Sequence, residues 1–207
     1  LKCEEPLKDV ESITSIGAST KRDDPTSIGK FGVGFKAVFA YTSTPEIHSG
    51  DFHFRIHDLV VPETKNIQKT NADARQTKFI FPFDHPTKKP AQAVAEIERA
   101  LRALGDNTLL FLKYIRYIEY LLPDGSSGSL ERIDRDNGHI EILSSHPGGK
   151  NTVSHWLRFE KNIEIIDEDD TSKTCDIAIA YQLEKVSSAK KDNFDWKIVS
   201  SERGQVS

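Results

Sequence analysis

Three glycines with a fixed spacing offer the clearest chemistry in the sequence. Gly29, Gly32 and Gly34 stand in the segment SIGKFGVGF, ahead of a mostly apolar stretch that ends at Ala40. Because glycine has no side chain, backbone amides there can approach phosphate oxygens closely and adopt backbone angles that other residues avoid. A helix beginning near Val33 would direct its unpaired N–H groups and positive dipole end at the same phosphates. The spacing therefore predicts a phosphate-binding turn.

The spacing also excludes two common phosphate loops. The Walker loop requires G-x-x-x-x-G-K followed by Ser or Thr, and the dinucleotide fingerprint requires G-x-G-x-x-G after a strand. The sequence instead has G-x-x-G-x-G at residues 29–34. A different class of nucleotide site is therefore indicated.

The motifs that flank the glycines carry a family resemblance. With SIGASTK at 15–21 and IGKFGVGFKAVFAYT at 28–42, the chain resembles the GHKL (Bergerat-fold) ATPase superfamily, which includes the ninety-kilodalton heat-shock chaperones. The form FGVGFKAVFAYTSTPEIHSG is most similar to the sacsin-like branch, and the likeness continues through FRIHDLVVP and QTKFIFPF. It covers roughly the first half of the chain, and the motifs of the second half are looser.

The resemblance implies a set of residues that contact ATP. Thr77 matches the family's threonine that touches adenine through water, and residues 18–27 match the lid that orders over ATP. Lys21 is the candidate in that lid for a phosphate contact, and Lys36 could add positive charge near the turn. The full set is Lys21, Gly29, Lys30, Phe31, Gly32, Val33, Gly34, Phe35 and Thr77.

Two departures from the family pattern concern catalysis and the adenine contact. Family members carry a helix with a Glu that activates water and an Asn that binds Mg²⁺, and these 207 residues do not contain it. Where the family has an Asp-x-Gly turn, this sequence has KCEEPL, with Cys3 and Glu4 near the expected positions. ATP and Mg²⁺ are the implied cofactors, and no catalytic residue is assigned. Because hydrolysis needs a positioned water and a metal, we expect no ATP turnover by these residues, whereas the intact protein could be an ATPase.

The pattern of elements predicts an α/β fold class. Residues 1–106 are expected to form a partial GHKL-type two-layer α/β sandwich, with a helix after the glycines and another from Pro90 to Gly105. Residues 107–207 are expected to form an antiparallel β-rich domain, the start of a middle-type domain. The first expected strand of this domain is LLFLKYIRYIEYLL. Turn signals at PDGSSG, RDNGH and HPGGKN separate the strands that follow.

Composition narrows the classes of partner. A formal net charge of -4 with dispersed basic residues argues against nucleic acid, and no apolar run approaches the ~20 residues that cross a bilayer. The two cysteines, Cys3 and Cys175, are expected to be reduced thiols in a cytoplasmic protein. The chain contains no methionine, so we expect it to be an excerpt cut at both ends.

Three other features have structural interpretations. His53 and His57 lie four residues apart on an expected strand, ~13 Å along it, so they are not predicted to share a metal. The acidic run DEDD at 167–170 is typical of a solvated loop, and the tyrosines at 114, 117 and 120 are typical of packing. No metal ligand is predicted.

The sequence thus favours ATP binding in a sacsin-like or chaperone-like protein, with nucleotide driving lid closure and a conformational change. Protein clients or other domains of a larger chain are the expected partners besides ATP. The alternative is a non-catalytic scaffold or interaction module that keeps the fold with an eroded nucleotide site, an interpretation supported by KCEEPL.

Overall fold

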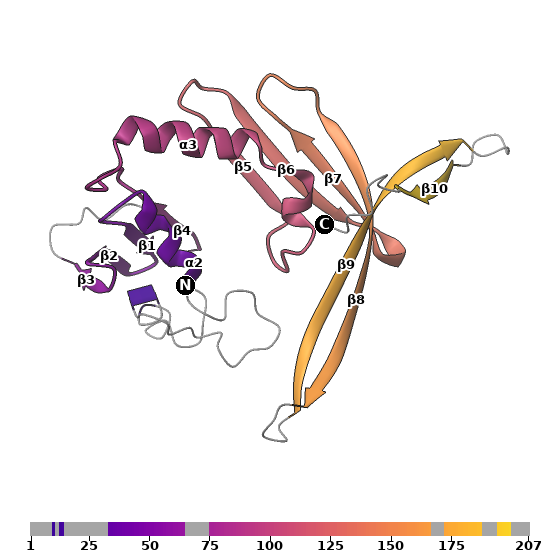
Figure 1. Cartoon of the computed structure of the whole chain (residues 1–207), viewed down its shortest axis with the longest axis horizontal. Coiled ribbons are helices and arrows are strands. Elements are labelled where there is room, and N and C mark those ends of the chain that lie inside the picture. Colours follow the sequence, from indigo (N-terminus) through magenta and orange to yellow (C-terminus); the bar gives the residue numbers. More distant parts are fainter. Residues whose placement is uncertain are drawn as a thin grey trace. The chain divides into compact units, whose positions relative to one another are not determined.

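The structure is a computed structural model that describes residues 10, 13–14, 33–64, 75–166, 172–187 and 194–199 (Figure 1). The chain divides into two compact units, residues 1–97 and residues 98–207. Each unit is described by itself below. The expected domain division at residues 106 and 107 stays a prediction.

The first unit contains a four-stranded antiparallel sheet in the order β3-β2-β1-β4. Short turns join the first three strands, so that β2 pairs with β1 and β3 pairs with β2. The bounds are β1 Glu46–Ser49, β2 Phe52–His57, β3 Val61–Glu63 and β4 Thr77–Ile80. The runs EIHSG, DFHFRIHDLVV and TKFIFPF are predicted as strands from their β-branched and aromatic content, and they contain β1, β2 and β4, whereas β3 is not predicted as a separate strand.

Helical segments cover one face of this sheet. The apolar stretch after the glycines forms α2 (Val33–Lys36) and a 3₁₀ helix, η1 (Ala37–Ala40), in place of one continuous helix. Phe35 and Phe39 pack on the buried core of the sheet. Val10 and Ile13, which are helical, pack on the same core. That core consists of Ile47, Phe54 and Ile56.

The predicted amphipathic helix is confirmed as α3 (Pro90–Arg102). Proline is favoured at the first helical position because its missing N–H would have no partner there. Ala93 is the buried residue of α3, and Glu96 accepts a hydrogen bond from Lys88 at 2.5 Å. Across the described ranges, no helix has the length and apolar character needed to cross a membrane.

The second unit is built on a six-stranded antiparallel sheet in the order β10-β9-β8-β7-β6-β5. Each strand pairs with its sequence neighbour, and β8 and β9 form a long hairpin (Figure 1). The bounds are β5 Tyr117–Leu121, β6 Ser127–Asp134, β7 His139–Ser145, β8 Thr152–Ile166, β9 Ser172–Ser187 and β10 Phe194–Ile198. The three predicted turns lie between β5 and β6, β6 and β7, and β7 and β8, so they are confirmed.

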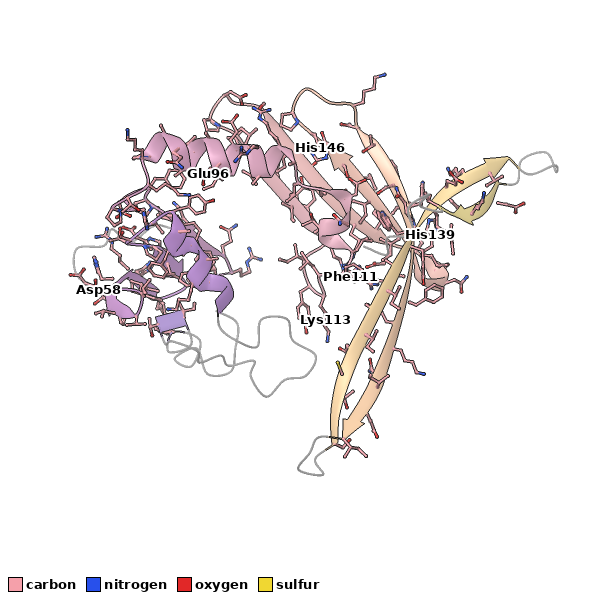
Figure 2. The ribbon with its side chains drawn as sticks, in the orientation of Figure 1. Asp58, Glu96, Phe111, Lys113, His139 and His146 are labelled. Carbon is pink, nitrogen blue, oxygen red and sulfur yellow. The ribbon has the colours of Figure 1, made fainter. Side chains whose placement is uncertain are left out.

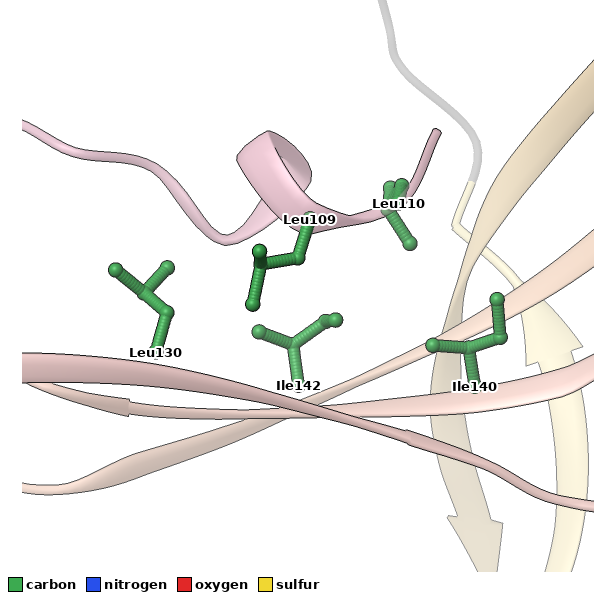
Figure 3. Packing of buried hydrophobic residues seen from close by; sticks show 5 residues of the cluster. All are labelled: Leu109, Leu110, Leu130, Ile140 and Ile142. Atoms are coloured by element: carbon green, nitrogen blue, oxygen red, sulfur yellow. The ribbon is translucent and has the colours of Figure 1, made fainter. Parts of the chain in front are cut away.

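The core of the second unit lies between one face of this sheet and the segment that contains the 3₁₀ helix η2 (Asp106–Leu109). Figure 3 shows Leu109 and Leu110 directed from this segment toward the sheet. Opposite them are the fully buried side chains of Leu130, Ile140 and Ile142.

Two arginines of the sheet hold the same segment through its backbone. The buried Arg132 donates through Nη1 to the carbonyls of Leu109 (2.7 Å) and Leu112 (2.6 Å). Arg158 donates to the carbonyl of Leu110 (2.7 Å). Because unpaired buried carbonyls are costly, these bonds allow an irregular segment to lie against the sheet.

The predicted α/β fold class is wrong. Both sheets are antiparallel, and the first unit is not a GHKL-type two-layer α/β sandwich. Short turns join β1 to β2 and β2 to β3, and a turn of that length can only join antiparallel neighbours. β4, which follows β3 after a longer connection, pairs antiparallel with β1. The prediction also placed a strand over 109–122, whereas β5 covers only Tyr117–Leu121. The residues before β5 do not form a strand because Leu109 and Leu110 pack into the core of the second unit.

Candidate functional site

The predicted nucleotide-binding residues are only partly within the described ranges. Lys21, Gly29, Lys30, Phe31 and Gly32 lie outside them, as does the predicted lid at 18–27. The backbone of Val33 begins α2, and Gly34, Phe35 and Thr77 are described with their surroundings. The geometry of the site therefore starts from the end of the glycine turn.

Gly34 is exposed in the single turn of α2. Among the described residues outside α2 and its chain neighbours, no atom lies within 4 Å of a Cβ atom built on Gly34. A phosphate-binding glycine needs open space of this kind beside its backbone. Since α2 is only four residues long, its dipole adds little, and backbone amides would have to provide the phosphate contacts.

Phe35, the residue after Gly34, packs against the sheet. Its ring lies 6.0 Å from the ring of Phe79 on β4 and 6.4 Å, edge to face, from that of Phe39. Alternate residues of a strand share a face, so Thr77 lies on the same face of β4 as Phe79. The structure therefore brings the end of the glycine turn to the sheet face that carries Thr77.

Thr77 is exposed at the start of β4. It pairs in register with Ser49 of β1, and the two hydroxyl oxygens are 2.8 Å apart. A hydroxyl can donate one hydrogen bond and accept others, so Thr77 is not limited to a single hydrogen-bond partner. The water-mediated contact of Thr77 with adenine stays a prediction.

Lys36 is held by backbone carbonyls, and its predicted charge near the phosphate stays a prediction. Its ammonium group donates to the backbone carbonyls of Ile13 (2.7 Å) and Leu59 (2.5 Å). Burial lowers the pKa of Lys36 below its usual value. The lysine thus links α2 to the turn between β2 and β3 and to the N-terminal helical residues.

The two histidines of β2 have separate partners. His53 contacts His48 of β1 with their Nδ1 atoms 3.0 Å apart. His57 Nε2 lies within hydrogen-bond distance, 2.8 Å, of Glu63 Oε2 on β3. His53 and His57 therefore belong to different side-chain pairs on the sheet.

The structure brings together one group that the sequence reasoning missed. His139, Glu141 and His155 place three potential ligand atoms within 4.8 Å of one another on the second sheet. The signal was the His-x-Glu pattern on an expected strand, which puts both side chains on one face. His155 lies beside them because of the register of β7 with β8, which the spacing of residues in the sequence does not reveal.

Comparison with known proteins supports the sacsin resemblance. Residues 6–98 match the sacsin domain family. The chain is 44% identical to the protein NO VEIN of Arabidopsis thaliana over 198 aligned residues, which cover 86% of this chain and 7% of that protein. It is 46% identical to human sacsin over 44 residues, 21% of this chain and 1% of sacsin. No solved structure matches the chain significantly.

The match to the sacsin domain family covers the segment that contains the candidate site. Gly34, Phe35 and Thr77 all lie within the matched residues 6–98. The chain spans only a small part of both relatives, 7% of one and 1% of the other. Membership of the wider GHKL superfamily stays a prediction, and the chain is sacsin-like over residues 6–98.

Proposed function

We propose that the sacsin-like part of the chain binds ATP through the glycine turn at 29–34 and Thr77. Mg²⁺ accompanies the triphosphate, and the nucleotide orders residues 18–27 over the site and so drives a conformational change. This is the function that the resemblance to GHKL ATPases implies. The protein clients, the other domains and the cytoplasmic location expected of the intact protein remain part of the proposal.

One observation carries the proposal furthest. The open backbone at Gly34 and the exposed hydroxyl of Thr77 are linked through the contact of Phe35 with Phe79. In the proposed site the turn binds the triphosphate and Thr77 binds the adenine through water. The phosphate contacts and the adenine contact must be held at a fixed distance from each other, because binding energy is lost when one of them is misplaced. The aromatic contact supports that arrangement.

The hydroxyl pair of Thr77 and Ser49 offers a matched test. Both Thr77→Val and Ser49→Ala remove the hydrogen bond between the two side chains. Each should therefore lower the free energy of unfolding by a similar amount, ~0.5–1.5 kcal/mol. Only Thr77→Val should also weaken the binding of ATP, because only Thr77 is proposed to contact the adenine. Titration with ATP by calorimetry, alongside urea unfolding, separates the two effects.

The expected result is a loss of ATP affinity of ~10-fold in Thr77→Val, as one lost hydrogen bond would cause. Ser49→Ala should keep the affinity of the unmodified chain. Equal affinities in the two variants would show that Thr77 has only a structural role, and the proposed site would lose its adenine contact.

A further inference from the structure

His139, Glu141 and His155 gather on the face of the second sheet opposite its core. His139 and Glu141 are alternate residues of β7, and Glu141 is the register partner of His155 on β8. The neighbouring residues Ile140 and Ile142 point the other way, into the core (Figure 3). Strand alternation thus fixes all three side chains on one face, at the end of β7 where Figure 2 labels His139.

The distances among these side chains suit a small cation. His139 Nε2 lies 3.1 Å from His155 Nδ1, and Glu141 Oε1 lies 4.0 Å from the same Nδ1. Two nitrogens bound tetrahedrally to zinc at ~2.0–2.1 Å are about 3.3 Å apart. The imidazole pair already has that separation, and a small rotation of the Glu141 side chain would complete a three-ligand set.

The surroundings hold the three groups in place. Arg135 binds the other carboxylate oxygen of Glu141, with Nη2 to Oε2 at 2.8 Å. Trp196 of β10 lies against both rings, with centroids 5.0 Å from His139 and 4.4 Å from His155. An outer partner that orients a ligating carboxylate is a common feature of metal sites.

From this geometry we propose that His139, Glu141 and His155 form a binding site for a divalent transition-metal ion, Zn²⁺ being the best fit. Imidazole nitrogens with a carboxylate oxygen suit zinc and its first-row neighbours, whereas Ca²⁺ and Mg²⁺ need mostly oxygen ligands. The site has three protein ligands, so a fourth position is left for water or for a donor from another molecule. The ion joins β7 to β8.

The charges around the site act in both directions. Burial, with a smaller contribution from His139, lowers the pKa of His155, whereas Glu141 acts to raise it. Arg135 and Lys185 are positive and oppose a cation, and Lys185 Nζ lies 5.4 Å from the centre of the Trp196 ring. The negative charge of Glu141 offsets part of that repulsion.

Zinc binding to the full chain tests the proposal. Competition with a chromophoric chelator should give one Zn²⁺ per chain, and His155→Gln and Glu141→Gln should each weaken it by at least ~10–100-fold. The matched control is His146→Gln. His146 follows the opposite end of β7, ~23 Å from His139 (Figure 2), and hydrogen-bonds to Tyr120 at 3.3 Å. This control should bind zinc as the unmodified chain does.

A second readout places the ion without relying on the ligand variants. Co²⁺ quenches nearby indole fluorescence, and in Trp156→Phe the one remaining tryptophan is Trp196, beside both rings. One equivalent of Co²⁺ should quench this emission, and Zn²⁺ should restore it. Absence of quenching, or equal zinc affinity in His155→Gln and the unmodified chain, would overturn the site. The site lies in the second unit, so its failure would leave the nucleotide proposal unaffected.

Discussion

At the scale of single residues, the turn between β2 and β3 shows a conformation that its side chains do not favour. Asp58 and Leu59 both have positive φ angles, 48° and 69°. The Val60 N–H donates to the carbonyl of His57 at 3.1 Å, which closes a two-residue hairpin turn. Turns of this kind prefer Gly at the second central position, because a side chain there is strained. Lys36, through its bond to the Leu59 carbonyl, helps to hold the turn.

Replacing Leu59 by Gly should therefore stabilise the first unit. Relief of ~1–2 kcal/mol of left-handed strain outweighs the ~0.5–1 kcal/mol of added freedom in the unfolded chain. Little packing is lost, since Leu59 is 47% exposed. The measurement is urea unfolding followed by circular dichroism. Leu121→Gly is the control, because Leu121 is exposed in an ordinary strand, and the same substitution should destabilise there. A lower unfolding midpoint for Leu59→Gly would show that the turn is not strained.

At the scale of elements, local signals predicted the regular parts and long-range contacts decided the rest. The Asn137-Gly138 turn between β6 and β7 was visible in RDNGH, and both residues have the positive φ angles that such a turn requires. The first part of the strand expected at 109–122 is not a strand, because Arg132 and Arg158 hold the backbone of that apolar run and their positions along the chain give no local signal. The histidine cluster was missed for the same reason: it depends on the register of β7 with β8.

The turn between β5 and β6 contains a carboxylate whose protonation should affect stability. Asp124 accepts hydrogen bonds from the hydroxyl (2.6 Å) and the N–H (2.9 Å) of Ser126, and it pairs with Arg102 at 2.7 Å. These contacts, those of Ser126 above all, lower the pKa of Asp124 from 3.8 to about 2. A lowered pKa means that the folded state favours the ionised form, so the stabilisation is present above pH 3.8 and is lost as pH falls toward 2.

Asp124→Asn should remove this pH dependence. The free energy of unfolding of the unmodified chain should exceed that of the variant by a constant amount above about pH 5, and the difference should shrink between about pH 4 and pH 2. Urea unfolding of both proteins across that range provides the measurement. A difference that does not change with pH would mean that Asp124 has the same pKa in the folded and unfolded chains.

At the scale of the whole molecule, the two units carry two independent proposals. The first unit holds the sacsin-like segment with Gly34 and Thr77, and the second holds the proposed metal site on its sheet. The sequence predicted the sacsin likeness because the motifs around the glycines are colinear with the family. The same motifs did not predict the arrangement of the first sheet. The α/β sandwich was expected from the family likeness alone, and the strand order β3-β2-β1-β4 differs from it.

ATP binding by the glycine turn is the central claim, and substitution at Gly34 tests it most directly. Valine at Gly34 would fill the space beside the backbone, where none of the described residues beyond α2 and its chain neighbours places an atom within 4 Å of the added Cβ. The fold should therefore tolerate the change, while a phosphate would be excluded. Ala37→Val adds similar bulk at an exposed position of η1 and serves as the control. Calorimetric titration with ATP and Mg²⁺ should show saturable binding in the unmodified chain and in Ala37→Val, and none in a folded Gly34→Val. Binding that survives in Gly34→Val, or no binding in any of the three proteins, would contradict the claim.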